Sequence, residues 1–156
     1  MFDKRRDTKL ESEGAEFLVL GNLLINAIPA YKTYTNMPGY DLVATNPEKN
    51  TSVKIQVKSR FKTNWGGFII NNFDSDFVVF VALNRGVERK NGKRDDDKKD
   101  PNFYVFPIEY VKEIRDEKNK WGKISKSRMK NCEKYENKWE LITQKLNEAN
   151  ILSKHL

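Results

Sequence analysis

The sequence predicts an α/β domain in which helices flank a central mixed β-sheet of about five strands. Three observations predict it: a helical apolar stripe near the N-terminus, a series of short strand-like segments in the middle, and two helical segments towards the C-terminus. A chain of 156 residues suits one hydrophobic core. We therefore expect a single domain over residues 1–156.

The first expected element is a helix over residues 8–27. Its apolar side chains recur at helical spacing, and Pro29 ends it because the proline ring cannot continue a helix. Six later segments have strand patterns: residues 31–35, 41–45, 52–61, 68–71, 77–83 and 103–106. The segment at 77–83 is nearly all apolar, so we expect it to be a central strand buried on both faces.

Residues 52–61 show the clearest strand alternation in the chain. Three apolar side chains point to one face and three polar side chains to the other: Val53, Ile55 and Val57 against Lys54, Gln56 and Lys58. Residues 46–50 have turn chemistry and separate this strand from the one at 41–45. The two strands should therefore form a hairpin.

The remaining segments are predicted from charge and proline placement. Residues 85–100 are highly charged and poor in apolar side chains, so we expect a surface loop. Within it, Asp95 to Asp97 read as part of a charge-balanced loop rather than as a metal site. Pro107 suits the first position of a helix that reaches about residue 118. A last amphipathic helix is expected over residues 137–150, with an apolar face formed by Trp139, Ile142 and Leu146.

Composition narrows the class of protein. The formal charge of +7 and the pI of about 9.4 favour a polyanionic partner such as nucleic acid. No apolar stretch is long enough to span a membrane, and the N-terminus lacks the apolar run of a signal peptide. Cys132 is the only cysteine, which excludes an internal disulfide, and a sole histidine in the tail, His155, excludes a convincing Ser/His/Asp triad. We expect a cytoplasmic protein.

The predicted hairpin gathers one group of chemically capable side chains. Gln56 and Lys58 share a face because the strand period is two, and Asp41 starts the neighbouring strand. A carboxylate and an amide oxygen are suitable ligands for Mg²⁺. A lysine ammonium beside them can stabilise charge on a phosphate or orient water. The alternation alone fits equally well with an ordinary solvated strand face.

A basic stretch at residues 118–130 is the second candidate site, because it contains no acidic residue. It could follow a phosphate backbone, with Trp121 either stacking on a base or anchoring a solvated loop to the core. With residues beside the hairpin, the candidate nucleic-acid contacts are Lys54, Ser59, Arg60, Lys62, Lys120, Trp121, Lys123, Lys126 and Arg128. For Arg60 and Lys62, a solvated surface role fits equally well.

The motifs around the hairpin resemble a known nuclease core. Residues 39–43 (Gly-Tyr-Asp-Leu-Val) and 55–59 (Ile-Gln-Val-Lys-Ser) resemble the core motif of the PD-(D/E)XK superfamily, which includes many restriction endonucleases and archaeal-type Holliday-junction resolvases. The upstream helix, with Glu13 and Glu16, resembles the helix that supplies a further acidic residue in many members. The resemblance covers roughly residues 8–118 and implies a restriction-endonuclease-like core.

The resemblance implies a metal-dependent endonuclease that hydrolyses DNA phosphodiester bonds, of the restriction, junction-resolving or repair type. The implied catalytic residues are Asp41, Gln56, Lys58 and Glu16, with Glu13 in reserve. Mg²⁺ or Mn²⁺ would be held by Asp41, Gln56, Glu16 and the carbonyl of Val57. The resemblance also favours a homodimer acting on DNA.

Two departures from the motif bear on these expectations. The proline of the motif is displaced, because Tyr40 precedes the aspartate and Pro38 lies further upstream. Gln56 stands where glutamate is usual, and an uncharged amide attracts a cation less strongly. The alternative is therefore a catalytically weak or inactive nuclease fold that serves as a nucleic-acid-binding or regulatory module.

Overall fold

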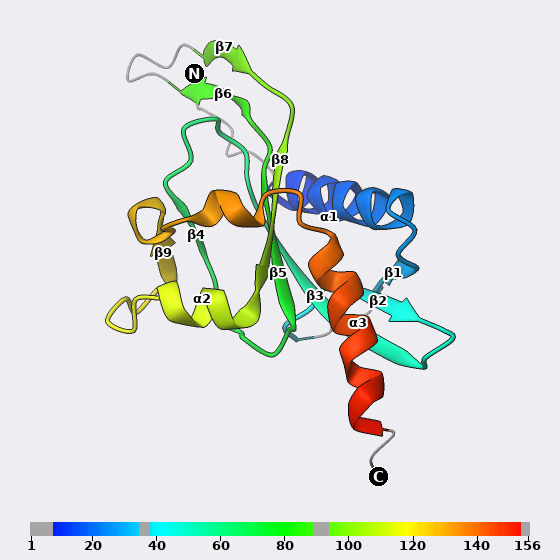
Figure 1. Cartoon of the computed structure of the whole chain (residues 1–156). Coiled ribbons are helices and arrows are strands. Elements are labelled where there is room, and N and C mark those ends of the chain that lie inside the picture. The colour runs from blue at the N-terminus through cyan, green and yellow to red at the C-terminus, as the bar shows by residue number, and fades with distance from the viewer. Residues whose placement is uncertain (1–7, 35–37, 89–93, 154–156) are drawn as a thin grey trace.

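The central feature of the fold is a five-stranded sheet with strand order β1-β2-β3-β5-β8 (Figure 1). The computed structural model describes residues 8–34, 38–88 and 94–153. The sheet strands are β1 (Ala30–Lys32), β2 (Leu42–Asn46), β3 (Thr51–Arg60), β5 (Phe77–Ala82) and β8 (Asn102–Pro107). β3 and β5 run parallel and the other neighbours antiparallel. The predicted mixed sheet of about five strands is therefore confirmed.

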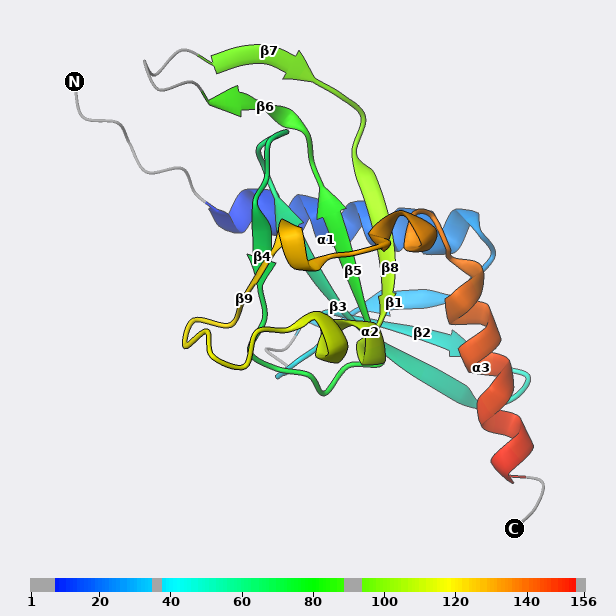
Figure 2. The same ribbon diagram turned by 60° about the vertical axis from the view of Figure 1, so that its left-hand side comes forward.

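Helices and short strands cover both faces of this sheet. The helices are α1 (Thr8–Ile25), α2 (Ile108–Ile114) and α3 (Glu140–Ser153). One core joins α1 and α3 to the sheet, and a second joins α2 and a small β4–β9 ribbon to the opposite face (Figure 2). All six residues of β5 are buried because they alternate between these two cores, as expected for a central strand. None of the helices in the described parts of the chain is long and apolar enough to cross a membrane.

Two segments depart from the expectations. The strand predicted at residues 68–71 is β4 (Gly67–Ile69), which lies outside the central sheet and pairs with β9 (Lys123–Ser125). The loop expected at residues 85–100 contains a hairpin of β6 (Arg85–Glu88) and β7 (Arg94–Lys98). Paired main-chain groups satisfy one another whatever the side chains are, so charged sequences also form hairpins. Residues 89–93, Thr35, Met37 and His155 lie outside the described residues.

The chain between α2 and α3, which includes the basic stretch at residues 118–130, contains regular structure where a solvated loop was one interpretation of the sequence. Beyond β9, the chain forms two short 3₁₀ helices, η1 (Lys126–Arg128) and η2 (Cys132–Tyr135), before it reaches α3. Ile124 of β9 and Met129 are buried in the second core. These two apolar side chains hold the basic surface against the sheet.

One strand changes partners in the middle of the sheet. β3 pairs with β2 through residues 51–55 and with β5 through residues 55–60. From Gln56 onwards, no strand in the described part of the chain pairs with the edge of β3 that faced β2. This open edge leaves main-chain groups available to side chains, and the candidate site lies there.

The second core depends on an aromatic cluster. Phe80 is fully buried, and its ring lies within 4.7–6.1 Å of the rings of Trp65, Phe68 and Tyr104. We expect Phe80→Ala to lower the free energy of unfolding by about 3–5 kcal/mol, because it removes apolar area and leaves a cavity. Urea denaturation measures this change. Ile25→Ala is the control, since Ile25 is 85% exposed, and an equal effect of both substitutions would contradict this packing.

Candidate active site

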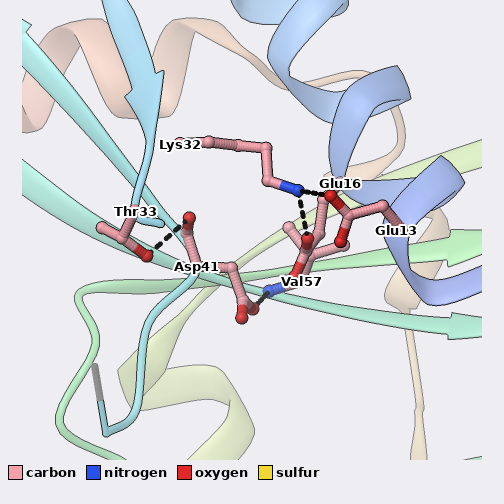
Figure 3. A network of polar contacts seen from close by, with 6 residues as sticks. All are labelled: Glu13, Glu16, Lys32, Thr33, Asp41 and Val57. Carbon is pink, nitrogen blue, oxygen red and sulfur yellow. Dashed lines mark hydrogen bonds and ion pairs between the residues drawn. The ribbon is translucent and has the colours of Figure 1, made fainter. Parts of the chain in front are cut away.

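Asp41 is fixed at the open edge of β3 by both its main chain and its side chain (Figure 3). Its N–H donates to the Ile55 carbonyl at 2.8 Å, and its carboxylate Oδ2 accepts from the Val57 N–H at 2.8 Å. Thr33 donates to the Asp41 carbonyl through its N–H at 3.0 Å and its Oγ1 at 3.1 Å. The carboxylate thus replaces the missing strand partner of β3, and it cannot swing away without exposing the Val57 N–H.

Gln56 is buried, with 5% of its surface exposed, and its amide is oriented by two main-chain carbonyls. Its Nε2 donates to the carbonyl of Gly39 at 2.9 Å and to that of Asn72 at 3.3 Å. Two acceptors require the –NH₂ group on that side, so the opposite atom is the oxygen. Gln56 Oε1 is buried and has no hydrogen-bond partner in the structure. A buried amide oxygen in that state can accept a donor or a cation at little further cost.

The two loops that hold Gln56 approach each other closely. Gly39 has a φ of +87°, and a Cβ at this position would lie 2.5 Å from the side-chain oxygen of Asn72. Only glycine combines this backbone conformation with this contact. The loop before Asp41 and the loop before β5 therefore meet directly over the amide of Gln56.

Lys32 of β1 joins two carboxylates of α1 to the site. The Lys32 side chain is 5% exposed, and its Nζ lies 2.9 Å from a carboxylate oxygen of Glu16 and also contacts Glu13 (Figure 3). Burial alone would lower the pKa of Lys32, but the hydrogen bonds to Glu13 and Glu16 outweigh burial and raise its pKa. Lys32 therefore remains an ammonium and offsets negative charge at this position.

The pKa values of Glu16 and Lys58 are shifted towards their neutral forms. Burial raises the pKa of Glu16, and the nearby Asp41 carboxylate raises it further, against the opposing effect of Lys32. Burial also lowers the pKa of Lys58, and Arg60 adds to that shift while Asp41 opposes it. Both shifts have desolvation as their largest cause. They also show that Glu16 and Lys58 each interact electrostatically with Asp41.

A groove with a volume of about 410 Å³ continues from the C-terminal end of β3. It lies between the first turn of α1 and the β4–β9 ribbon, and its lining includes three basic side chains, Arg60, Lys62 and Lys123, and one acidic side chain, Glu11. Ser59 lies in the same wall, and Arg60 Nε donates to the Gly67 carbonyl at 2.7 Å. The groove therefore starts one residue after Lys58 and has a positive lining.

The other candidate nucleic-acid contacts lie at separate positions. Lys54 Nζ lies over the Tyr40 ring, and Lys126 Nζ lies over the Trp65 ring at 4.3 Å from its centroid. The guanidinium of Arg128 donates to the Ile114 and Arg115 carbonyls at 2.9 Å each, so it satisfies the C-terminal end of α2. Trp121 is 80% exposed. The alternative in which its ring anchors the loop to the core is therefore wrong.

Three groups at the site did not emerge from the sequence. Lys32 lies within a predicted strand that alternates aromatic and polar residues. Its partners on α1, Glu13 and Glu16, could be assigned to it only once the sheet order was known. Thr33 binds the Asp41 carbonyl through its N–H and Oγ1 because the β1–β2 pairing continues one residue beyond Lys32, and that register has no sequence signature. The carbonyl of Asn72 has no side-chain signature at all, so no motif could have indicated it.

The arrangement fits a divalent cation through mixed oxygen ligands. Within the described residues, no three His, Cys, Asp or Glu side chains are placed together as metal ligands. A cation here would therefore use the carboxylates of Asp41 and Glu16 together with the unpartnered Oε1 of Gln56. Oxygen ligands of this kind suit Mg²⁺ and Mn²⁺. The N–H of Val57 faces Asp41, and the carbonyl of the same residue lies on the same strand edge.

The fold is restriction-endonuclease-like, as the motifs implied. A bacterial homing endonuclease has a similar structure, with a TM-score of 0.60 and 24% identity over 94% of this chain and 98% of that chain. A Holliday junction resolvase, Hjc of the archaeal hyperthermophile Archaeoglobus fulgidus, gives a TM-score of 0.46 and 18% identity over 76% of this chain and 86% of its own. Neither the models of protein families nor the curated proteins contain a match.

The geometry explains why this chain has glutamine at position 56. A glutamate would place a carboxylate oxygen against the Gly39 and Asn72 carbonyls, which offer only lone pairs. We expect Gln56→Glu to lower the free energy of unfolding by about 3 kcal/mol in metal-free buffer, because a buried charge would face two acceptors.

The matched control is Gln56→Met, which removes the same hydrogen bonds without adding charge. Urea denaturation with EDTA should show a smaller loss for this variant, of about 1–2 kcal/mol. If the glutamate variant is as stable as the wild type, the amide clamp does not select glutamine.

Proposed function

We propose that this protein is a metal-dependent endonuclease that hydrolyses phosphodiester bonds in DNA. The observation that carries the proposal is the buried, unpartnered Oε1 of Gln56, which immediately precedes the Val57 N–H that holds the Asp41 carboxylate; Glu16 in turn interacts with Asp41. A buried oxygen without a donor is unfavourable unless a bound group completes it. Two carboxylates and an amide oxygen at the open edge of a strand form such an incomplete set of ligands.

Asp41, Gln56, Glu16 and the Val57 carbonyl would hold Mg²⁺ or Mn²⁺. When bound, such an ion supplies electrophilic stabilisation of a phosphate and lowers the pKa of a coordinated water. The contribution of the chain is to fix the ligands. Asp41 is held by β3, and Gln56 is held by two main-chain carbonyls.

Lys58 supplies the adjacent positive group. It lies two residues beyond Gln56 on the same strand, is half-buried, and has a lowered pKa because of its burial. A lysine amine in this position can donate to a phosphate oxygen as negative charge develops, or orient the attacking water. The lowered pKa reduces the cost of moving a proton at Nζ.

The basic groove beyond β3 is suited to the DNA backbone. Ser59, Arg60, Lys62 and Lys123 line it, and the net charge of +7 favours association with a polyanion. Its position directly after Lys58 would place a bound phosphate chain in line with the site. Cutting both strands of a duplex would require a second active site, and a homodimer is the simplest way to provide one.

Two substitutions at the site should separate chemistry from folding. We expect Lys58→Ala to reduce cleavage of DNA by about 100-fold or more in Mg²⁺ or Mn²⁺, because it removes the group that stabilises developing charge. Asp41→Asn should reduce cleavage at least as much while preserving the acceptor for the Val57 N–H. The assay follows plasmid, branched and single-stranded DNA on gels.

Lys145→Ala is the control for this assay, because Lys145 is exposed on α3 and lies away from the groove. Its cleavage rate should equal that of the wild type. An absence of cleavage by the wild type on all three DNAs, or equal cleavage by Lys58→Ala, would contradict the nuclease proposal.

A second candidate function is a nucleic-acid-binding module without catalysis. The observation that favours it is the ammonium of Lys32, which already neutralises part of the charge of Glu16 and Glu13. Together with the neutral amide of Gln56, this leaves less negative charge for a cation than two free carboxylates would provide.

Calorimetric titration with Mn²⁺ separates the two functions. The nuclease proposal predicts saturable binding by the wild type and a loss of at least about 10-fold in affinity for Asp41→Asn, because that variant loses one charged ligand. Lys32→Met should tighten binding, since it frees the charge of Glu16. No measurable Mn²⁺ binding, with DNA affinity unchanged in Asp41→Asn, would favour the binding module.

A further inference from the structure

The loop between α2 and β9 holds an exposed tryptophan in a fixed conformation. The side-chain oxygen of Asn119 accepts from the N–H of Trp121 at 3.0 Å and from that of Lys123 at 3.3 Å. The Asp116 carbonyl accepts from Asn119 N–H at 3.0 Å, and the Asn119 carbonyl accepts from Gly122 N–H at 3.2 Å. Four hydrogen bonds within so short a segment make the loop a defined turn that presents its tip.

Trp121 at that tip contrasts with the other tryptophans of the chain. It is 80% exposed, whereas Trp65 and Trp139 are 8% and 5% exposed. In the described part of the chain, the Trp121 ring has no aromatic or cationic partner. A large aromatic side chain in water loses the free energy that burial would give it. Its placement on a rigid turn points to a partner that covers the ring.

The charge around Trp121 identifies the kind of partner. From residue 118 to residue 130 the chain has no acidic side chain, and every basic side chain in that stretch is exposed: Lys118, Lys120, Lys123, Lys126, Arg128 and Lys130. An exposed aromatic ring among lysines is the arrangement by which proteins bind single-stranded nucleic acid, with the ring stacking on a base and the lysines contacting phosphates. A surface that binds another protein would carry fewer dispersed charges than this one, because charged residues are depleted at the core of protein–protein interfaces.

A short stretch of main chain connects this loop to the candidate active site. The Gly122 carbonyl accepts from the Ile70 N–H at 3.0 Å, and the Asn72 carbonyl accepts from Gln56. Gly122 has a φ of +72°, and a Cβ there would lie 2.2 Å from the Asn71 side-chain oxygen, so the two segments are in close contact. Figure 1 shows this loop (yellow) beside β4, whose continuation leads to β5.

The spacing between the two positions suits one piece of DNA. Residues 70–72 span at most about 7 Å when extended, and one hydrogen-bonded contact at each end adds a few ångströms more. With the step from Gly122 and the indole side chain added, the Trp121 ring lies within roughly 25 Å of the Gln56 amide, which corresponds to about seven base steps at 3.4 Å per step. A base on Trp121 and a phosphate at Gln56 can belong to the same strand.

We propose that Trp121 stacks on an unpaired base and thereby directs the protein to DNA that has a single-stranded or branched stretch near the site of cleavage. This inference rests on the proposed function, because it takes DNA as the substrate. A base inside a duplex must first leave its stack to reach the ring, whereas an unpaired base need not. Selectivity for the unpaired base follows from that difference.

Intrinsic fluorescence tests the contact directly. In EDTA, where metal-dependent cleavage is prevented, the protein is titrated with a duplex carrying a short single-stranded gap and with the fully paired duplex of equal length. The gapped DNA should quench the emission of Trp121, and Trp121→Phe should remove most of the quenching, because Trp139 is 5% exposed and Trp65, which lines the basic groove, is only 8% exposed. No quenching of the wild type by gapped DNA would overturn the proposal.

Affinities measured with the same DNAs test selectivity. Trp121→Ala should weaken binding to gapped DNA by about 10-fold and leave the paired duplex nearly unchanged, and Trp121→Phe should retain most of the preference. Lys120→Ala should weaken both DNAs equally and reduce their salt dependence. Ile25→Ala, an exposed apolar residue at the far end of α1, should change neither. Equal weakening of both DNAs by Trp121→Ala would overturn the proposal.

Three further results separate this inference from its rivals. If sedimentation without DNA shows that Trp121→Ala dissociates a dimer, the ring contacts a second copy and the proposal is overturned. Selective quenching by gapped DNA in a protein that cleaves nothing would support stacking while the nuclease proposal fails. If the wild type cleaves DNA and Trp121→Ala cleaves both gapped and paired DNA at the wild-type rates, the nuclease proposal would stand and the stacking proposal would fail.

Discussion

The structure depends on the point at which β3 loses one of its two neighbours. β2 pairs with this strand only as far as Ile55, while β5 continues alongside it to Arg60. A strand edge without a partner leaves main-chain groups unsatisfied, and the Asp41 carboxylate satisfies one of them at Val57. The same interaction that completes the sheet therefore fixes a carboxylate beside Gln56 and Lys58. The hydrogen bond from the Val57 N–H to the Asp41 carboxylate therefore contributes both to the stability of the sheet and to the geometry of the site.

Charge at the site is balanced rather than simply negative. Burial raises the pKa of Glu16, the nearby Asp41 carboxylate raises it further, and the ammonium of Lys32 opposes both effects. Gln56 adds an oxygen without adding charge. This balance lets the carboxylates of Asp41 and Glu16 remain close together in the free protein. A third carboxylate at position 56 would give three uncompensated charges in a half-buried position, which would destabilise the fold. In the proposed metal site, the affinity for a cation would therefore depend on the competition from Lys32.

The loop before β5 links two surfaces that are distant in the sequence. Its residues contact the Gly122 turn at one end and the amide of Gln56 at the other, so the α2–β9 loop and the hairpin are held at a fixed separation. Close packing of main chain against glycine leaves little room for adjustment at either contact. A long polymer that contacts one of these two surfaces would therefore meet the other at a fixed distance. A flexible connection would not fix that distance.

The sequence by itself determined the elements that depend on local pattern. The alternation in residues 52–61, the apolar run at 77–83 and the N-terminal helical stripe were sufficient for the sheet and for placing Gln56 and Lys58 on one strand. The turn chemistry of residues 46–50 placed Asp41 beside that strand, and the motif resemblance added Glu16. Only the tertiary structure decided the rest: Lys32 reached α1 because β1 forms the edge of the sheet, and the free oxygen of Gln56 resulted from two carbonyls on distant loops. Those contacts arise from main-chain positions, which side-chain periodicity does not encode.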